Sequence, residues 1–154
     1  AKAIEDGNPA DLIVESLQKD LAQSKIFVSV RNLKYMIKGG RVSRPKGLIA
    51  SALGLNPVIS MDETGGSSLF GKTFSQGASM QKIFSHIMKI SRGKKIWNYM
   101  ILHANNAEGA LEAEERMTGI TGRKPVSVVN ISPVIGMHAG SGAVAVSLLF
   151  ENQD

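Results

Sequence analysis

The chain of 154 residues contains no cysteine, and that absence excludes several kinds of site. Disulfide bonds, zinc centres built on thiolates and thiol nucleophiles all need cysteine. A chain without cysteine also fits a reducing compartment, so we expect the protein in the cytoplasm. Aromatic residues are scarce as well, at 5%, which is too few for a platform that stacks single-stranded nucleic acid.

Long apolar runs and segregated charge are also missing from the sequence. No apolar segment is long enough to span a bilayer, and the polar residues 1–7 do not resemble a signal peptide. The net charge of +5 raises the alternative of a nucleic-acid-binding domain, but Lys and Arg are scattered, with one cluster at residues 92–95. We therefore expect a solvated basic face, no nucleic-acid partner and no stable insertion into a membrane.

The composition that is present is typical of one globular domain with a single core. Hydrophobic residues make up 43% of the chain and charged residues 20%. The first residues include no Met and have the composition of a helix end. We therefore expect residues 1–8 to be the tail of a helix from a missing N-terminal lobe, and residues 9–154 to form the domain.

Hydrophobic periodicity, proline and glycine divide the chain into alternating helices and strands. Helices are expected over residues 9–23, 32–37, 45–53, 78–91 and 107–118, the last ended by Gly119. Strands are expected over residues 26–30, 57–61, 68–72, 96–103, 126–131 and 143–150. One hairpin, with its turn at residues 62–66, and the closing strand interrupt the βα alternation. This pattern favours an α/β fold, a two-layer sandwich with a mixed β-sheet of about six strands and helices mainly on one face.

The most informative segment is Lys38-Gly39-Gly40-Arg41-Val42-Ser43, which follows the short helix over residues 32–37. One glycine suffices to end a helix, because glycine adopts positive φ without steric cost. The second glycine, followed by Arg and Ser, suggests a turn that presents a charged fork and bare backbone N–H groups to an anion. The simpler alternative is a helix C-cap followed by a solvated Arg41.

A second glycine-rich segment, residues 136–142, surrounds His138. We expect a loop there, because small residues let the backbone approach a ligand and successive N–H groups can form a nest for an anion. His138 could donate a hydrogen bond to a carboxylate or phosphate near neutral pH; the alternative is an exposed histidine in a plain turn. Ser141 lies between glycines without the nucleophile-elbow pattern, so we assign it to the loop backbone.

The remaining residues show no catalytic or metal-binding pattern. The three histidines and the scattered carboxylates lack metal-ligand spacing, and no paired carboxylates suggest a general acid and base. His86 is expected in solvent or at the edge of the core. His103 could line a cleft, but capping or packing is the favoured expectation. We therefore expect a binding component rather than an enzyme, with no metal or cofactor. The two glycine-rich segments leave open an alternative, a binding module for a phosphorylated metabolite or nucleotide.

Taken in order, these motifs resemble the C-terminal lobe of the DegV family, the bacterial fatty-acid-binding proteins. The resemblance covers nearly the whole chain and is carried by residues 33–43, 47–49, 55–60, 62–66, 103–108 and 135–143. It implies a two-lobed cytoplasmic protein that carries a fatty acid, with Ser and Thr of the other lobe holding the carboxylate. It also implies a partner, a separate fatty acid kinase that phosphorylates the bound fatty acid.

The resemblance also implies roles for individual residues. His138 matches a histidine near the fatty-acid head group, with Gly140 and Ser141 in the same loop. Arg41 matches an arginine at the ligand entrance that could contact the kinase or the new phosphate. Burying an acyl chain gains roughly 0.8 kcal/mol per methylene, so an apolar tunnel can bind it tightly. The predicted apolar faces supply candidates for the tunnel wall: Leu48, Ile49, Ala52, Leu53, Ile59, Met61 and Ile135.

Overall fold

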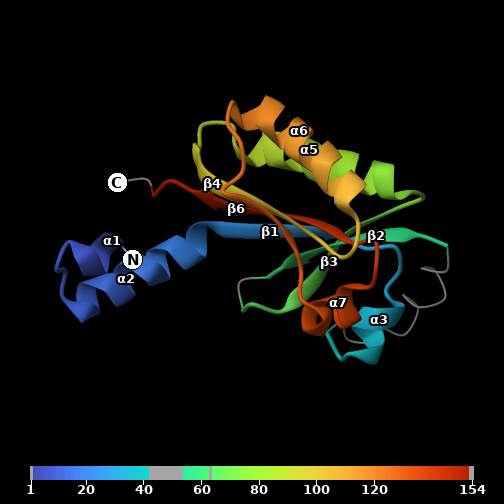
Figure 1. Ribbon diagram of the computed structural model, residues 1–154, viewed down its shortest axis with the longest axis horizontal. Coiled ribbons are helices and arrows are strands. Elements are labelled where there is room, and N and C mark those ends of the chain that lie inside the picture. Colours follow the sequence, from blue (N-terminus) through green and yellow to red (C-terminus); the bar gives the residue numbers. More distant parts are fainter. Residues whose placement is uncertain (1, 42–53, 63, 153–154) are drawn as a thin grey trace.

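The computed structural model describes residues 2–41, 54–62 and 64–152. Figure 1 shows one sheet with helices on both of its faces. The described helices are α1 (Lys2–Glu5), α2 (Ala10–Gln23), α3 (Lys34–Lys38), α5 (Gln76–Ile90), α6 (Ala107–Thr121) and α7 (Pro133–Ala139). The described strands are β1 (Ser24–Ser29), β2 (Asn56–Met61), β3 (Ser67–Thr73), β4 (Ile96–His103), β5 (Ser127–Asn130) and β6 (Val144–Phe150).

The six strands form one mixed sheet in the order β3-β2-β1-β6-β4-β5. Among the described strands, β4 and β5 run parallel and the other neighbouring pairs are antiparallel. The closing strand β6 lies inside the sheet, where it pairs with β1 on one side and β4 on the other. The predicted α/β fold with a mixed six-stranded sheet is therefore confirmed, and each predicted strand lies within a few residues of an observed one.

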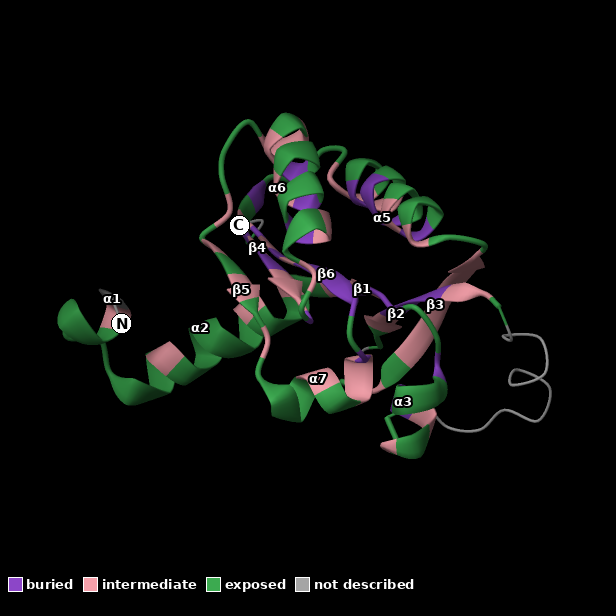
Figure 2. Ribbon diagram, turned by 45° about the vertical axis from the view of Figure 1, so that its right-hand side comes forward, coloured by how far each residue is buried: buried purple, intermediate pink, exposed green. Residues whose placement is uncertain are grey.

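Alternation of side chains along the central strands gives the sheet two apolar faces. Phe27 of β1 and Val146 of β6 belong to the core that α5 and α6 cover. Their neighbours Val28 and Ala145 lie on the opposite face, where they line a cavity. The two long helices and the cavity therefore lie on opposite faces of the sheet. Figure 2 shows α5 and α6 on one face and α3 and α7 on the other.

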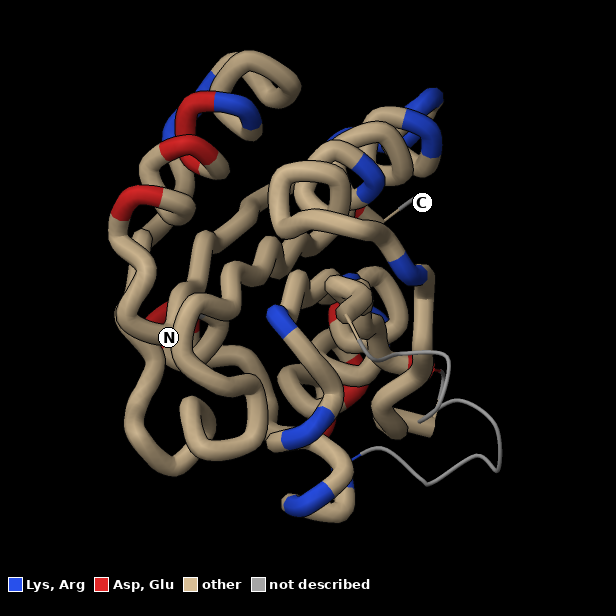
Figure 3. Tube along the Cα trace, turned by 90° about the vertical axis from the view of Figure 1, so that its right-hand side faces the viewer, with Lys and Arg blue, Asp and Glu red and all other residues tan. Residues whose placement is uncertain are grey.

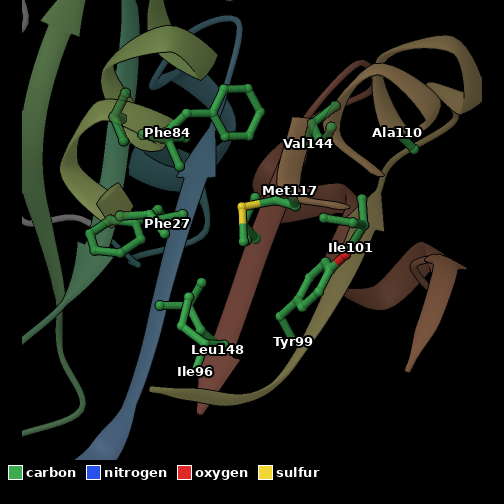
Figure 4. Packing of buried hydrophobic residues seen from close by; sticks show 14 of the residues in the cluster. Phe27, Phe84, Ile96, Tyr99, Ile101, Ala110, Met117, Val144 and Leu148 are labelled. Atoms are coloured by element: carbon green, nitrogen blue, oxygen red, sulfur yellow. The ribbon is translucent and has the colours of Figure 1, made fainter. Parts of the chain in front are cut away.

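The main core fills the space between the sheet and the pair α5 and α6. Ile83 and Ile87 of α5 and Met117 of α6 are fully buried against the strands. Figure 4 shows Met117 of α6 in the same cluster as the rings of Phe27 and Tyr99, on the face of the sheet that α5 and α6 cover. The hydroxyl of Tyr99 donates to the carbonyl of Arg123 at 2.7 Å, so this buried polar atom is satisfied.

Side-chain caps begin the two long helices where the sequence changes from loop to apolar periodicity. The Ser75 side chain accepts from the Ala78 N–H, and the Asn106 side chain accepts from the Gly109 N–H. The predicted end of the second helix at Gly119 is wrong, because α6 continues to Thr121. Gly122 ends it instead, in the left-handed conformation at φ 72°.

The second face of the sheet carries the short helices α3 and α7 (Figure 2). A smaller buried cluster joins α3 to this face through Val30, Leu33, Met36, Ile59, Ala104 and Ala143. The loop predicted over residues 136–142 is wrong in its first half, because residues 133–139 form α7. Pro133 at the first turn is pre-organised for a helix, and this signal outweighs Gly136 in the helix interior.

Helix α2 projects from the sheet beyond the start of β1 (Figure 1). It has no buried residue, although its apolar side chains recur at helical spacing. Leu17 and Leu21 are 55% and 71% exposed. Among the described residues, no helix is both long enough and apolar enough to cross a membrane.

Candidate functional site

The second face of the sheet holds an apolar cavity of about 400 Å³. Its floor is formed by β1, β4 and β6, and its wall by α3, α7 and the segment that precedes α7. A volume of this size is in the range of small-molecule sites. The described lining residues are Ile26, Val28, Val30, Met36, Arg41, Ser67, Leu102, His103, Ala104, Ile131, Val134, Ile135, His138, Ala139, Ala143 and Ala145.

Small residues on the central strand create the depth of this cavity. Ala143, just before β6, and Ala145, within it, lie on the cavity side. Val144 and Val146 pack into the core on the opposite side. Because successive residues of a strand point to opposite faces, the two faces of β6 differ in side-chain volume. The large side chains complete the core, and the small ones leave space for a ligand.

His138 lies on α7 and lines the cavity. Its Nδ1 atom is buried and has no hydrogen-bond partner among the described residues. Buried polar atoms are generally hydrogen-bonded, so this atom is an exception that needs a structural reason. The reason is its contact with α3.

Helices α3 and α7 pack directly against each other and bring together the two glycine-rich segments. A Cβ atom at Gly39 would lie 2.6 Å from Cε1 of His138. A Cβ atom at Gly140 would lie 2.7 Å from Cδ2 of Tyr35. Each helix therefore places a ring against the glycine that follows the other helix, although the two glycines are far apart in the sequence.

The turn after α3 does not present free backbone N–H groups, as the sequence had suggested. Gly39 N–H donates to the carbonyl of Tyr35, and Arg41 N–H donates to the carbonyl of Met36, both at 2.9 Å. Gly40 N–H donates to the carbonyl of Ile37 at 3.2 Å. The prediction of bare N–H groups is wrong because these donors close the end of the helix. The side chain of Arg41 remains as the charged group at the cavity (Figure 3 shows the basic residues of this region).

The N–H groups of the second glycine-rich segment are also engaged. Gly136 donates to Ser132, Gly140 to Gly136 and Gly142 to Ala104, all at backbone carbonyls. The predicted anion nest is therefore not formed by these three glycines, and the observation that favoured a phosphate site is lost. Ser141 is exposed in the turn.

The predicted wall residues fall in three groups. Ile135 lines the cavity. Ile59 is buried in the smaller cluster beneath α3, and Met61 is 53% exposed at the end of β2. Leu48, Ile49, Ala52 and Leu53 lie outside the described residues.

Several lining residues were not predicted, among them Ile26, Val28, Leu102 and Ala145. The sequence does contain a signal for them, because the central strands are apolar at consecutive positions and not only at alternate ones. Such strands are covered on both faces. The pattern does not indicate that the elements packed on one of these two faces leave a cavity above the sheet.

The other two histidines have local partners, and His103 also lines the cavity. Nδ1 of His103 accepts the N–H of Asn106 at 3.1 Å, just before α6, in agreement with the predicted capping. His86 lies at the edge of the core, with its ring centroid 5.2 Å from that of Phe27 and 4.5 Å from that of Phe70. Burial lowers the pKa of His86, and the charge of Lys89 lowers it further.

Within residues 2–41, 54–62 and 64–152, no group of three or more His, Asp or Glu side chains could hold a metal ion. The polar side chains around the cavity are instead one cation, Arg41, with Ser67, His103 and His138, among apolar walls. Such an arrangement suits a ligand with a long apolar part and one anionic end.

Comparison with known proteins identifies relatives along the whole chain. A family model described as "Uncharacterised protein, DegV family" matches residues 1–151. A DegV domain-containing protein of Clostridium acetobutylicum is 28% identical over 140 residues, which cover 91% of this chain and 50% of the relative. One from Staphylococcus aureus is 27% identical over 146 residues, which cover 95% and 52%. The chain thus spans about half the length of the curated relatives it matches.

Solved structures of similar fold come from the same group of proteins. A fatty acid binding DegV family protein from Streptococcus agalactiae superposes with a TM-score of 0.87 at 22% identity, over 98% of this chain and 53% of that one. A DegV family protein from Eubacterium eligens, loaded with heptadecanoic acid, superposes with a TM-score of 0.78 at 18% identity, over 96% and 53%. At these identities the likeness establishes the fold.

Proposed function

Because the chain belongs to the DegV family, we propose that it is a lipid-binding lobe that holds a fatty acid in the cavity between β1, β6 and α7. The observation that carries this proposal is the composition of the cavity wall. Aliphatic side chains form nearly all of it, and Arg41 and His138 are among its few polar members. Similar folds have been described with fatty acids bound, which supports the same ligand class here.

The energetics of an acyl chain agree with this cavity. Each methylene moved from water to an apolar wall contributes roughly 0.8 kcal/mol, so a chain of ordinary length binds without specific contacts. The carboxylate is different, because a charge left unpaired in an apolar site costs several kcal/mol. The site must therefore supply donors at one end only.

We assign the head-group end to His138 and the rim to Arg41. The imidazole lines the cavity, whereas the Arg41 side chain is exposed and its Nη1 donates to the carbonyl of Gly39 at 3.5 Å. Gly140 and Ser141 follow His138 and complete this end of the site. In this proposal, residues 9–154 form the lipid-binding domain, and residues 1–8 are the end of a second lobe that precedes it. That second lobe supplies further donors to the carboxylate.

The proposed role of the complete protein is to shield the acyl chain in the cytoplasm while presenting the carboxylate to a separate fatty acid kinase. In this proposal the protein binds the fatty acid and does not catalyse a reaction, because the polar groups of the cavity serve to hold a carboxylate. Arg41 is suitably exposed to meet the kinase or the new acyl phosphate at the rim.

Native mass spectrometry tests the proposal directly. Protein purified from bacteria should carry added masses that match fatty acids, and delipidated protein should take up hexadecanoic acid. A spectrum of apo protein alone, together with no uptake on titration, would contradict lipid binding. Calorimetry with nucleotides and sugar phosphates serves as the comparison, and we expect no heat of binding from either.

A further inference from the structure

We propose that Gly39 is a positioning residue that orients the imidazole of His138 for its ligand, an inference that rests on the proposed function of His138. Gly39 directly follows α3 and His138 lies on α7, so the two residues belong to different sequence motifs. The structure makes them neighbours, because the ring of His138 occupies the space that a side chain at Gly39 would need.

The backbone conformation of Gly39 does not explain why glycine stands there. Its φ of −82° and ψ of 0° are open to any residue. The next residue is different, because Gly40 has φ 69°, in the left-handed region that favours glycine. Of the pair, Gly40 serves the turn and Gly39 provides space.

The available space is narrow enough to restrict the ring. A Cβ atom on residue 39 would lie 2.6 Å from Cε1 and 3.2 Å from Cγ of His138, and closer still to Nδ1. Real Cβ atoms essentially never approach carbon so closely, so the ring or the backbone would have to move. On the other side of the same contact, the Tyr35 ring rests on Gly140, which limits sliding of α7 along α3.

This packing also assigns different roles to the two ring nitrogens. Nδ1 is buried against α3 without a partner among the described residues. A buried N–H group without an acceptor is rarer than a buried acceptor without a donor. With Nδ1 as the unprotonated nitrogen, the proton lies on Nε2, and in this proposal Nε2 donates to an oxygen of the ligand carboxylate.

Substitution Gly39→Ala in the 154-residue chain tests this inference, with Gly136→Ala as the matched control. Gly136 lies on α7 two residues before His138, and a Cβ there meets nothing within 4 Å. We expect Gly39→Ala to shift the unfolding equilibrium toward the unfolded state by roughly tenfold or more, as in an overpacked core. Gly136→Ala should be neutral or stabilising.

A double-mutant cycle with His138→Ala separates this contact from a general effect on the turn. Without the imidazole, Gly39→Ala meets no ring and should cost nothing. An equal cost of Gly39→Ala in both backgrounds would overturn the proposed contact.

The orientation of the ring has its own readout, which stability alone would not provide. In protein labelled with ¹⁵N-histidine, the His138 signals are identified by their loss in His138→Ala. We expect Nδ1 to be the unprotonated nitrogen, and Gly39→Ala to change the tautomer populations, whereas Gly136→Ala should not. Unchanged His138 signals in Gly39→Ala would overturn the positioning role.

Binding of hexadecanoic acid distinguishes this inference from the proposed function. Gly39→Ala and His138→Ala should each weaken binding by roughly tenfold, the effect of losing one hydrogen bond to a charged group, and the double variant no more than either. If the stabilities show coupling between Gly39 and His138 but the affinity for hexadecanoic acid is unchanged in the variants, the head-group role of His138 is overturned. Absence of coupling would overturn the contact, whatever the protein binds.

Discussion

At the scale of single residues, the cavity depends on methyl side chains where the adjacent strand positions carry larger ones. Ala145 is 7% exposed and lines the cavity, whereas Ala113 is 1% exposed within the core between α6 and the sheet. The two alanines are nearly equal in burial, but only one borders empty space. Burial alone therefore does not indicate which position tolerates a larger side chain.

We expect Ala145→Leu to block the ligand and leave the fold intact. The added atoms enter the cavity, so the free energy of unfolding should change by less than about 1 kcal/mol, while uptake of hexadecanoic acid falls. Ala113→Leu is the control, and overpacking there should cost about 1–3 kcal/mol. Urea titration measures the first quantity and native mass spectrometry the second. Full lipid uptake by Ala145→Leu would argue against this cavity as the site.

His86 makes the stability of the protein depend on pH. Burial, and then the charges of Lys89 and Lys82, lower the pKa of His86 below its usual 6.5. The folded protein therefore disfavours the imidazolium, and the unfolded chain binds more protons once the pH falls below about 6.5. The stabilising contribution is complete above that pH and is lost as the pH falls through the folded-state pKa.

A variant without this titration should lose less stability in acid. We expect the free energy of unfolding to decrease more between pH 7 and pH 5 in the wild-type protein than in His86→Gln. Urea titrations at the two pH values measure the difference. Identical decreases would show that the environment of His86 does not affect its protonation.

At the scale of elements, one side chain joins the start of α6 to the segment before β6. Oδ1 of Asn106 accepts the Gly109 N–H at 3.1 Å, and its Nδ2 donates to the carbonyl of Gly142 at 2.9 Å. The same carbonyl also accepts from the Gln76 side chain at the start of α5. The carbonyl of Gly142, in the turn between α7 and β6, therefore accepts hydrogen bonds from side chains at the starts of both long helices.

The two halves of the Asn106 amide can be separated by substitution. Asn106→Asp should retain the cap and lose the bond to Gly142, whereas Asn106→Ala loses both. We expect the alanine variant to be destabilised by about 1–2 kcal/mol, and the aspartate variant by less. Ser75→Ala, which removes a cap alone, is the comparison in thermal or urea unfolding. A loss in Asn106→Ala no larger than that in Ser75→Ala would show that the bond to Gly142 adds nothing beyond the cap.

At the scale of the whole molecule, the sheet separates a filled core from a face that is only partly covered. The core side contains the fully buried Ile83 and Met117. The other side carries the cavity. Figure 2 shows the two short helices on that side, with α2 projecting beyond the sheet. The larger core therefore lies on one face, and the smaller cluster and the proposed binding site lie on the other.

Substitutions on α2 and α5 should reveal this division. Leu17 is 55% exposed, so Leu17→Ala should change the free energy of unfolding by less than about 0.5 kcal/mol. Ile83 is fully buried, and Ile83→Ala should cost about 2–5 kcal/mol. Urea unfolding of the 154-residue chain measures both. A large loss for Leu17→Ala would mean that α2 belongs to the folding core of this chain.

Much of the fold could be predicted because local signals agree with the tertiary structure. Five of the six strands were located by their apolar pattern, β3 by the hairpin turn before it, and the start of α6 by Asn106. The misassigned elements are those in which a glycine was taken as a helix end or loop residue but lies inside a helix. Gly119 and Gly136 lie inside helices, where a helix tolerates glycine at a cost of about 1 kcal/mol. Glycine was therefore a good indicator of φ > 0 only at positions such as Gly122 and Gly140.

The site was less predictable because it joins segments that are distant in the sequence. His138 and Gly39 were each singled out by glycine-rich surroundings, but no local pattern indicates that one ring packs on the other residue. The same holds for the cavity floor, since Val28 and Ala145 look like ordinary strand residues. Their partners across the space are decided by strand order and helix packing.

By itself, the sequence determined the mixed α/β fold, the positions of the strands and the family resemblance, because periodicity, caps and ordered motifs are local properties. Only the tertiary structure decided which apolar residues fill the core and which line a cavity. It also decided why two glycines follow α3, since Gly40 permits a left-handed turn and Gly39 makes room for His138. The physical reason is that the space around a residue depends on which residues pack against it. The residue that packs against Gly39 is His138, from a distant part of the chain.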